Sequence, residues 1–202
     1  MVVIGGHSRN IGKTSVVAGL IRALPEARWT AVKITQFGHG VCSANGEPCE
    51  CDSAEHPVAI SEERERDSGT DSSRYLEAGA VRSLWVRTRQ GDLAAAMPAL
   101  RREMAAAENV IVESNSVLRF VRPDLYAAVL DPQVSDFKRS ALRYLDRADA
   151  LLLTGEEPEG EVWAGVSVVL LRGIRRFRVS APAYVSEGFV GFARERLFGE
   201  GR

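Results

Sequence analysis

Residues 5–15 read Gly-Gly-His-Ser-Arg-Asn-Ile-Gly-Lys-Thr-Ser and carry the strongest structural signal in this sequence. They follow an apolar run, residues 2–4, which predicts a short buried strand. They precede apolar residues at helical spacing, from Val16 to Leu24, which predict a helix that Pro25 ends. A loop of this kind is typical of phosphate binding, because its backbone N–H groups and the helix N-terminus point at one anion. The stretch therefore predicts a site for nucleotide phosphates.

Individual residues of this loop have distinct expected roles. Gly12 lets the chain approach the phosphates closely, Lys13 adds a mobile positive charge, and the Thr14 hydroxyl can hold Mg²⁺. His7 stands where the first glycine is expected, and the glycine is one place earlier, at Gly6. Either the His7 side chain turns outward or the loop is one residue longer. The predicted nucleotide-binding residues of the stretch are Gly6, His7, Ser8, Arg9, Asn10, Ile11, Gly12, Lys13, Thr14 and Ser15.

The remaining sequence alternates apolar, β-rich runs with amphipathic stretches. Strands are predicted over 29–35, 81–87, 109–113, 126–130, 148–153, 166–171 and 184–185, with a weaker strand pattern at 56–60. Helices are predicted over 71–79, 92–107, 136–147 and 187–198. Such alternation favours a mostly parallel sheet with helices on both faces. We predict a three-layer α/β fold of the P-loop NTPase type, as a single domain over 1–202 with a loop insertion around 36–70.

Charge and hydropathy exclude several functional classes. The 202 residues carry 26 basic and 27 acidic side chains, a net charge of -1, whereas proteins that neutralise nucleic-acid phosphates usually have a basic surplus. No apolar run reaches the roughly 18 residues of a membrane span, and the N-terminal run is too short for an export signal. We expect a cytoplasmic protein without nucleic-acid or membrane partners. The lysines are Lys13, Lys33 and Lys138, and the last two could reach phosphates or substrate.

Acidic residues follow two of the predicted strands. Ligands collect at the carboxyl ends of parallel strands, and Glu113 ends one such strand, while Asp131 ends the next as a weaker candidate. Glu113 fits an acid that coordinates Mg²⁺ or activates a nucleophile, although a solvated carboxylate is the alternative for both residues. Asp71 first of all suits a helix N-cap. Residues 154–156 have a plausible place near the base, but ATP and GTP both stay open.

A group of thiols and imidazoles lies between the second predicted strand and the weak strand pattern. Thiolates together with imidazole suit tetrahedral Zn²⁺, and three cysteines with one histidine would close a structural site. An iron–sulfur cluster would use the same thiolates, and free thiols in a loop are the alternative to any metal. The candidate ligands, within eighteen residues, are His39, Cys42, Cys49, Cys51 and His56.

Four separated segments resemble one family, the P-loop proteins related to molybdopterin-guanine dinucleotide biosynthesis protein B (MobB). They are the phosphate loop at 6–14, the lysine-bearing strand at 32–35, the stretch Gly-Thr-Asp-Ser-Ser-Arg-Tyr-Leu-Glu-Ala-Gly-Ala at 69–80, and Val-Ile-Val-Glu at 110–113. The resemblance implies a dimeric nucleotide-binding protein. It places Lys13 and Thr14 at phosphate and Mg²⁺, gives Glu113 the acidic role, and puts Asp71 near the nucleotide or metal.

The sequence also departs from this family. Family members commonly continue the acidic strand as Glu-Gly, whereas Ser114 follows Glu113 here, and the family's His-x-His after the lysine strand is replaced by Gln-Phe-Gly-His at 36–39. The cysteine group is outside the family pattern. These departures indicate a side branch with a different partner or substrate.

The leading functional hypothesis is a Mg²⁺-dependent GTP- or ATP-binding accessory protein of molybdenum cofactor maturation with weak hydrolysis, acting with a nucleotidyltransferase. One alternative is a small-molecule kinase or ligase in which Lys13 neutralises charge, Glu113 activates an acceptor and residues 36–70 form a lid. The other alternative is a nucleotide-controlled metal-binding module that uses the cysteines.

Overall fold

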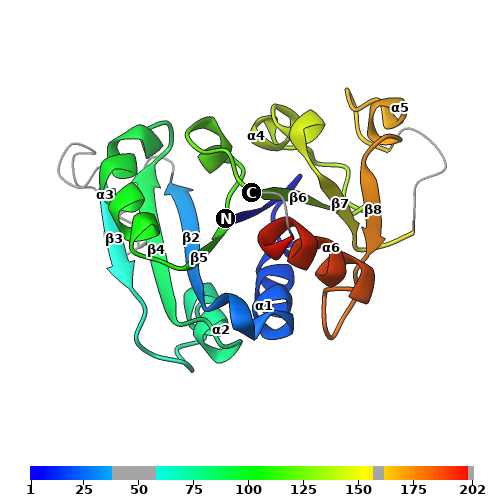
Figure 1. Cartoon of the computed structure of the whole chain (residues 1–202). Coiled ribbons are helices and arrows are strands. Elements are labelled where there is room, and N and C mark those ends of the chain that lie inside the picture. Colours follow the sequence, from blue (N-terminus) through cyan, green and yellow to red (C-terminus); the bar gives the residue numbers. More distant parts are fainter. Residues whose placement is uncertain (38–57, 157–161, 200–202) are drawn as a thin grey trace.

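The computed structural model describes residues 1–37, 58–156 and 162–199, and its strands form one sheet (Figure 1). The strands are β1 (Val2–Gly6), β2 (Trp29–Phe37), β3 (Val58–Glu62), β4 (Arg82–Arg89), β5 (Asn109–Glu113), β6 (Leu125–Leu130), β7 (Ala150–Leu153) and β8 (Arg175–Arg178). Their order across the sheet is β3-β4-β2-β5-β1-β6-β7-β8. Neighbouring strands pair in parallel, except that β3 runs antiparallel to β4.

Helices cover both faces of this sheet. They are α1 (Lys13–Ala23), α2 (Asp71–Glu77), α3 (Leu93–Ala105), α4 (Arg139–Leu142), α5 (Val168–Leu171) and α6 (Glu187–Phe198), with short 3₁₀ turns at η1 (Pro25–Ala27), η2 (Ser116–Arg119) and η3 (Leu145–Arg147). Figure 1 shows α1, α2 and α6 on one side and α3, α4 and α5 on the other. The predicted three-layer α/β fold is confirmed. Within the described residues, no helix has the length and apolar character needed to cross a membrane.

The central strand β1 is buried on both faces, which explains its unbroken apolar sequence. Side chains alternate between the faces of a strand. Val2 and Ile4 therefore join the core under α1 and α6, which includes Leu20, whereas Val3 joins the core under α3, which includes Leu100. An apolar residue is needed at every position of such a strand.

Two of the predicted late strands are wrong. Residues 168–171 form the helix α5, and the eighth strand is Arg175–Arg178, which has no apolar run. An edge strand with partly exposed side chains needs none, so a search for apolar runs misses it. At the predicted strand 184–185, Tyr184 has φ +53°, a left-handed conformation that an extended strand does not contain.

The predicted helix 136–147 is also wrong in extent. Only α4 and the turn η3 are helical, and the apolar side chain of Leu142 is 43% exposed. The reason lies in the preceding residues, because the Lys138 N–H donates to the His7 carbonyl at 2.8 Å and Lys138 is extended, with ψ 138°. Residues 136–138 are held against the phosphate loop and cannot start a helix.

Sheet register brings three parts of the chain to one place. Glu113, at the end of β5, is the register partner of Ile4 in β1 on one side and of Lys33 in β2 on the other. The loop that follows β1 therefore lies next to the acid that ends β5 and the lysine of β2.

Candidate functional site

The loop between β1 and α1 is shaped by glycines at points of close approach. Gly12 caps α1 with φ +87°, a conformation that favours glycine, and a Cβ there would lie 3.0 Å from the Tyr184 ring. A Cβ at Gly6 would lie 2.8 Å from the Lys13 side chain. This room lets Lys13 fold back across the loop, where its Nζ donates to the Ser8 carbonyl at 2.5 Å.

His7 turns into the protein core rather than outward. Its ring is fully buried, with the ring centroids of Phe137 and Trp163 at 5.1 and 5.3 Å. Nε2 accepts from the Asp131 N–H at 3.0 Å, and Nδ1 lies 2.8 Å from the Asp136 carbonyl, so the ring is neutral with its proton on Nδ1. Burial lowers the pKa of His7, although the Asp136 carbonyl opposes this effect.

The main chain of His7 is also engaged within the protein. Its N–H donates to the Val129 carbonyl at 3.2 Å, and its carbonyl accepts from the Lys138 N–H. Each polar group of His7 therefore has a partner in the fold. The residue anchors the start of the loop, which accounts for a histidine in the place of the usual glycine.

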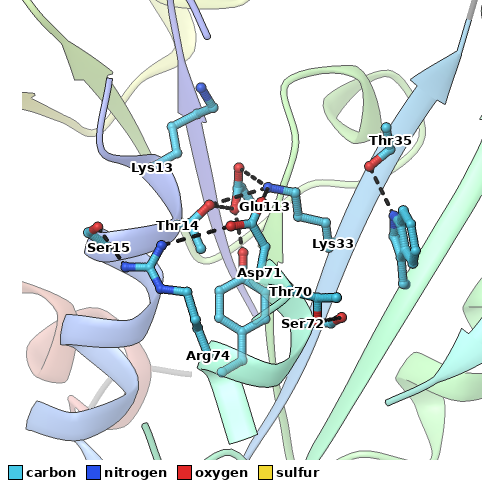
Figure 2. Close-up of polar contacts among 12 residues, drawn as sticks. Lys13, Thr14, Ser15, Lys33, Thr35, Thr70, Asp71, Ser72, Arg74 and Glu113 are labelled. Carbon is cyan, nitrogen blue, oxygen red and sulfur yellow. Dashed lines mark hydrogen bonds and ion pairs between the residues drawn. The ribbon is translucent and has the colours of Figure 1, made fainter. Parts of the chain in front are cut away.

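Beside the loop, three oxygen-bearing side chains meet around the ammonium group of Lys33 (Figure 2). The Lys33 Nζ donates to Asp71 Oδ2 at 2.5 Å, Glu113 Oε1 at 2.9 Å and Thr14 Oγ1 at 3.2 Å. These four residues come from β2, α2, β5 and α1. We call them the cation cluster.

The second carboxylate oxygen of Glu113 is held by two hydroxyl groups. Thr14 Oγ1 donates to Glu113 Oε2 at 2.8 Å, and the Tyr75 hydroxyl donates to the same atom. Burial raises the pKa of Tyr75 well above its ordinary value, and the negative charge of Glu113 adds to this effect. Tyr75 therefore acts as a hydrogen-bond donor that fixes the orientation of Glu113.

The two lysines of the site differ in their electrostatic environment. Burial opposes the charged form of Lys33, but Glu113 and Asp71 hold its pKa above the ordinary value. Burial lowers the pKa of Lys13 to about 8, against the effect of Glu113, and the nearby positive charge of Lys138 lowers it further. Among the described residues Lys13 has no bonded carboxylate. It is a partly desolvated positive charge that an anion would stabilise.

Three residues of the cation cluster carry oxygen atoms that could serve as ligands for Mg²⁺. Mg²⁺ prefers oxygen ligands, and this cluster offers the Thr14 hydroxyl with the carboxylates of Asp71 and Glu113. They converge on a positive charge, the ammonium of Lys33, which would have to withdraw for a metal ion to bind. Over 1–37, 58–156 and 162–199, no group of three or more His, Cys, Asp or Glu side chains could hold a metal ion.

Other predicted residues have structural partners. Ser15 Oγ accepts from Arg74 at 3.0 Å, and Ser8 Oγ donates to Asp136 at 2.8 Å. Asp131 accepts from the Gln133 N–H at 2.9 Å and so caps a local turn. The other loop residues divide between exposed and buried positions, with Arg9 and Asn10 exposed and Ile11 buried.

The predicted zinc site falls outside the described residues. This applies to all its candidate ligands, namely His39, Cys42, Cys49, Cys51 and His56. The described part of the predicted insertion contains β3, in agreement with the weak strand pattern at 56–60.

Sequence reasoning missed a clamp on the phosphate loop. The Gly6 N–H donates to Asn115 Oδ1 at 3.0 Å, and Asn115 Nδ2 donates to the Gly6 carbonyl at 2.8 Å. A Cβ at Gly5 would overlap Asn115 Oδ1, which explains the first glycine of the pair. A polar residue just beyond a buried strand is the signal that could have identified Asn115. Tyr75 gave no such signal, because a tyrosine in an amphipathic helix is usually part of the core.

Comparison with known proteins shows likeness at the level of the fold. No family model matches the sequence, and no curated protein matches it. Among solved structures, the chain is similar to HypB from Helicobacter pylori in complex with nickel, with a TM-score of 0.48 and 15% identity over 97% of this chain and 86% of that one.

Two further solved structures are similar to the chain. LpxK from Aquifex aeolicus in complex with ATP has a TM-score of 0.44 and 20% identity, and the match covers 88% of this chain and 52% of that one. MobB from Bacillus subtilis has a TM-score of 0.43 and 17% identity, over 98% of this chain and 99% of that one. MobB, whose family four segments of the sequence resemble, is thus among the solved structures to which this chain is similar.

Proposed function

We propose that the chain is a Mg²⁺-dependent P-loop protein that binds GTP or ATP. One observation carries the proposal: four segments that are far apart in the sequence meet beside the glycine-rich loop. Thr14, Lys33, Asp71 and Glu113 form the cation cluster, and Lys13 lies across the adjoining loop. Oxygen ligands for a metal ion, next to a loop with a lysine that can bind phosphate, are what a site for a polyphosphate and its metal ion requires.

The phosphate would bind in the loop that Lys13 now crosses. There the Lys13 ammonium would exchange the Ser8 carbonyl for a phosphate oxygen, and the N–H groups at the start of α1 would point at the same anion. Thr14, Asp71 and Glu113 would hold Mg²⁺, which neutralises phosphate charge when bound. The three donors on Glu113 favour a holding role over proton abstraction from an acceptor. The site is therefore better suited to nucleotide binding with slow hydrolysis than to rapid transfer.

The first prediction tests phosphate binding. Lys13→Ala removes the charge from the loop and is expected to abolish binding of GTP and ATP, measured by calorimetry with and without Mg²⁺. Arg102→Ala is the matched control, because Arg102 is an exposed cation of α3 on the opposite face. A Lys13→Ala protein that binds nucleotide with wild-type affinity would falsify the assignment.

We further propose a role in molybdenum cofactor maturation, in which the chain supplies nucleotide or assists the transferase that attaches GMP to molybdopterin. The support is the resemblance of four sequence segments to the MobB family, each of which contributes a residue to the loop or the cation cluster. A homodimer and a nucleotidyltransferase partner belong to the same proposal. Light scattering and co-purification with such a transferase test them, and a monomer that does not bind the transferase would contradict both.

A small-molecule kinase or ligase is the second candidate, because a basic cavity adjoins the site, as described below. Phosphate release that rises with one of a panel of small acids and alcohols would favour it.

For the residues outside the described structure, we propose that Cys42, Cys49 and Cys51, with His39 or His56, bind Zn²⁺. Metal analysis that finds neither zinc nor iron, with three titratable thiols, would contradict this. We also propose that residues 1–202 form a single domain.

A further inference from the structure

A cavity of about 450 Å³, apart from the candidate site, lies on the α3 and α4 face of the molecule. Its lining includes three arginines and two aromatic rings, with polar groups from Gln36 and two serines. The arginines and aromatic residues are Arg119, Phe120, Arg139, Arg143 and Tyr144. The phosphate loop and the cation cluster contribute no side chain to it.

Three residues that line this cavity closely follow, along the chain, residues of the candidate nucleotide site or its loop contacts. Gln36 lies three residues beyond Lys33 on β2, and Ser116 lies three residues beyond Glu113 at the end of β5. Arg139 follows Lys138, whose N–H bonds to the His7 carbonyl. The cavity is therefore next to the nucleotide site but separate from it.

The charge of the cavity is opposite in sign to that of the whole chain. The protein carries a net charge of -1, yet the lining has Arg119, Arg139 and Arg143 and no acidic residue. Within the part of the chain that the structure describes, none of these three guanidinium groups forms an ion pair. Unpaired guanidinium groups bind carboxylate and phosphate through two parallel hydrogen bonds. The arrangement fits an anionic group.

The remaining wall is apolar. Leu93 is 2% exposed and Tyr144 is 9% exposed, and Phe120 is half-buried beside them. Aromatic side chains of this kind pack against flat rings. The volume lies within the roughly 300–1,000 Å³ of small-molecule sites.

We infer that this cavity binds a second small molecule, a flat ring compound that carries a phosphate or carboxylate group, alongside the nucleotide. The inference rests on the proposed function, because it assumes that the chain binds a nucleotide at the same time as this second molecule. Because the lining excludes Lys13 and the cation cluster, the ligand and the nucleotide occupy the chain together and do not compete.

The probes are 1-naphthyl phosphate, 1-naphthoate, 1-naphthol and inorganic phosphate, titrated into the full chain with and without nucleotide and Mg²⁺. Only 1-naphthyl phosphate and 1-naphthoate carry both an aromatic ring and an anionic group. 1-Naphthol has the ring alone, and inorganic phosphate has the anionic charge alone. We expect 1-naphthyl phosphate or 1-naphthoate to bind at least about tenfold more tightly than 1-naphthol, which lacks the charged hydrogen bonds, or than inorganic phosphate, which lacks the ring contacts. The preference between the first two identifies the anionic group.

The paired variant Arg119→Ala/Arg143→Ala tests the location. Both side chains are exposed, so the change leaves the fold intact, and the affinity for the anionic probe is expected to fall about tenfold or more while nucleotide affinity is unchanged. Arg102→Ala is again the control and is expected to leave the affinities for probe and nucleotide unchanged. If the paired variant keeps full affinity for the probe, the inference is wrong.

Lys13→Ala separates this inference from the proposed function. A variant that loses nucleotide but keeps the probe supports two separate sites, and displacement of the probe by nucleotide would overturn the inference. If the wild-type chain binds nucleotide but neither anionic probe, the cavity is not a ligand site and the proposed function stands. If it binds an arginine-dependent probe but no nucleotide, the cavity stands as a binding site and the proposed function fails.

Discussion

Three basic residues of the site differ in their charge and in the groups that they contact. Lys33 holds Asp71 and Glu113 together, whereas Lys13 has a pKa lowered to about 8 and no bonded carboxylate among the residues that the structure describes. His7 must stay neutral, because its Nε2 accepts a backbone hydrogen bond. The site thus contains one neutralised cation, one cation available to an anion, and one buried neutral base.

Replacing Lys33 is predicted to destabilise the protein and to strengthen metal binding. Lys33→Met keeps most of the side-chain length but leaves Asp71 and Glu113 facing each other without a cation, at a cost of roughly 3 kcal/mol in the free energy of unfolding. Mg²⁺ should restore part of that loss and bind more tightly than to the wild type, because no ammonium competes for the oxygens. Denaturant unfolding with and without Mg²⁺ measures both effects. Lys138→Met is the control, and an equal response of the two variants would contradict the prediction.

Stability is predicted to fall in mild acid because of His7. Its pKa in the folded protein is below the ordinary value near 6.5, so the stability from the neutral ring is complete above that pH and is lost as the pH falls from about 6.5 through the folded pKa. Denaturant unfolding at a series of pH values measures the loss. His7→Gln is less stable but cannot gain this proton, so its dependence on pH over the same interval should be weaker. An unchanged slope in that variant would count against His7 as the source.

At the scale of elements, the two ends of β5 show how a strand supports a loop. Asn115, just beyond the carboxyl end, makes two hydrogen bonds to the main chain of Gly6. Asn109, at the amino end, donates to the Ala27 carbonyl at 2.9 Å. One asparagine therefore holds the phosphate loop, while the other holds the turn after α1.

These two asparagines form a matched pair for mutation. Asn115→Ala and Asn109→Ala each remove hydrogen bonds to main-chain groups and should each reduce the free energy of unfolding by about 1–3 kcal/mol. Asn115→Ala alone should also weaken nucleotide binding, because it frees Gly6 at the start of the phosphate loop. Calorimetry with GTP and ATP, alongside denaturant unfolding, distinguishes the two. Equal nucleotide affinity in both variants would show that the clamp has no part in binding.

At the scale of the whole molecule, the helix α6 and the strand β8 support the sheet away from the candidate site. The Phe189 ring is fully buried and lies 5.6 Å from that of Phe177 in β8, while Phe198 at the end of α6 is 46% exposed. This part of the molecule contributes to stability and supplies no residue to the cation cluster.

Phe189→Ala is accordingly predicted to reduce the free energy of unfolding by about 3–5 kcal/mol, through loss of buried ring contacts. Phe198→Ala in the same helix should change it by less than about 0.5 kcal/mol. Thermal unfolding measures both, and nucleotide affinity at a temperature where both variants are folded should equal that of the wild type. Loss of nucleotide affinity in folded Phe189→Ala would show that α6 acts on the site.

The elements that the sequence predicts well are those with a local signal. The strand 109–113 and the helix 187–198 occupy the predicted ranges, because the pattern of apolar residues that identifies each of them lies entirely within the segment. The strand 175–178 was missed and the helix 136–147 was overextended, because one lies at a sheet edge and the other begins with residues bonded to His7. Contacts between distant segments decide both cases.

The same distinction applies to the site. The loop at 6–14, the acid Glu113 and the lysine Lys33 can be recognised locally, because a phosphate loop and a strand end each have their own pattern of residue types. Their meeting point, the inward orientation of His7 and the clamp by Asn115 arise from strand register and from hydrogen bonds that span 80 to 124 positions of the chain. Local patterns record which chemistry each segment carries, whereas parallel pairing of β1, β2 and β5 determines which of those groups come within bonding distance.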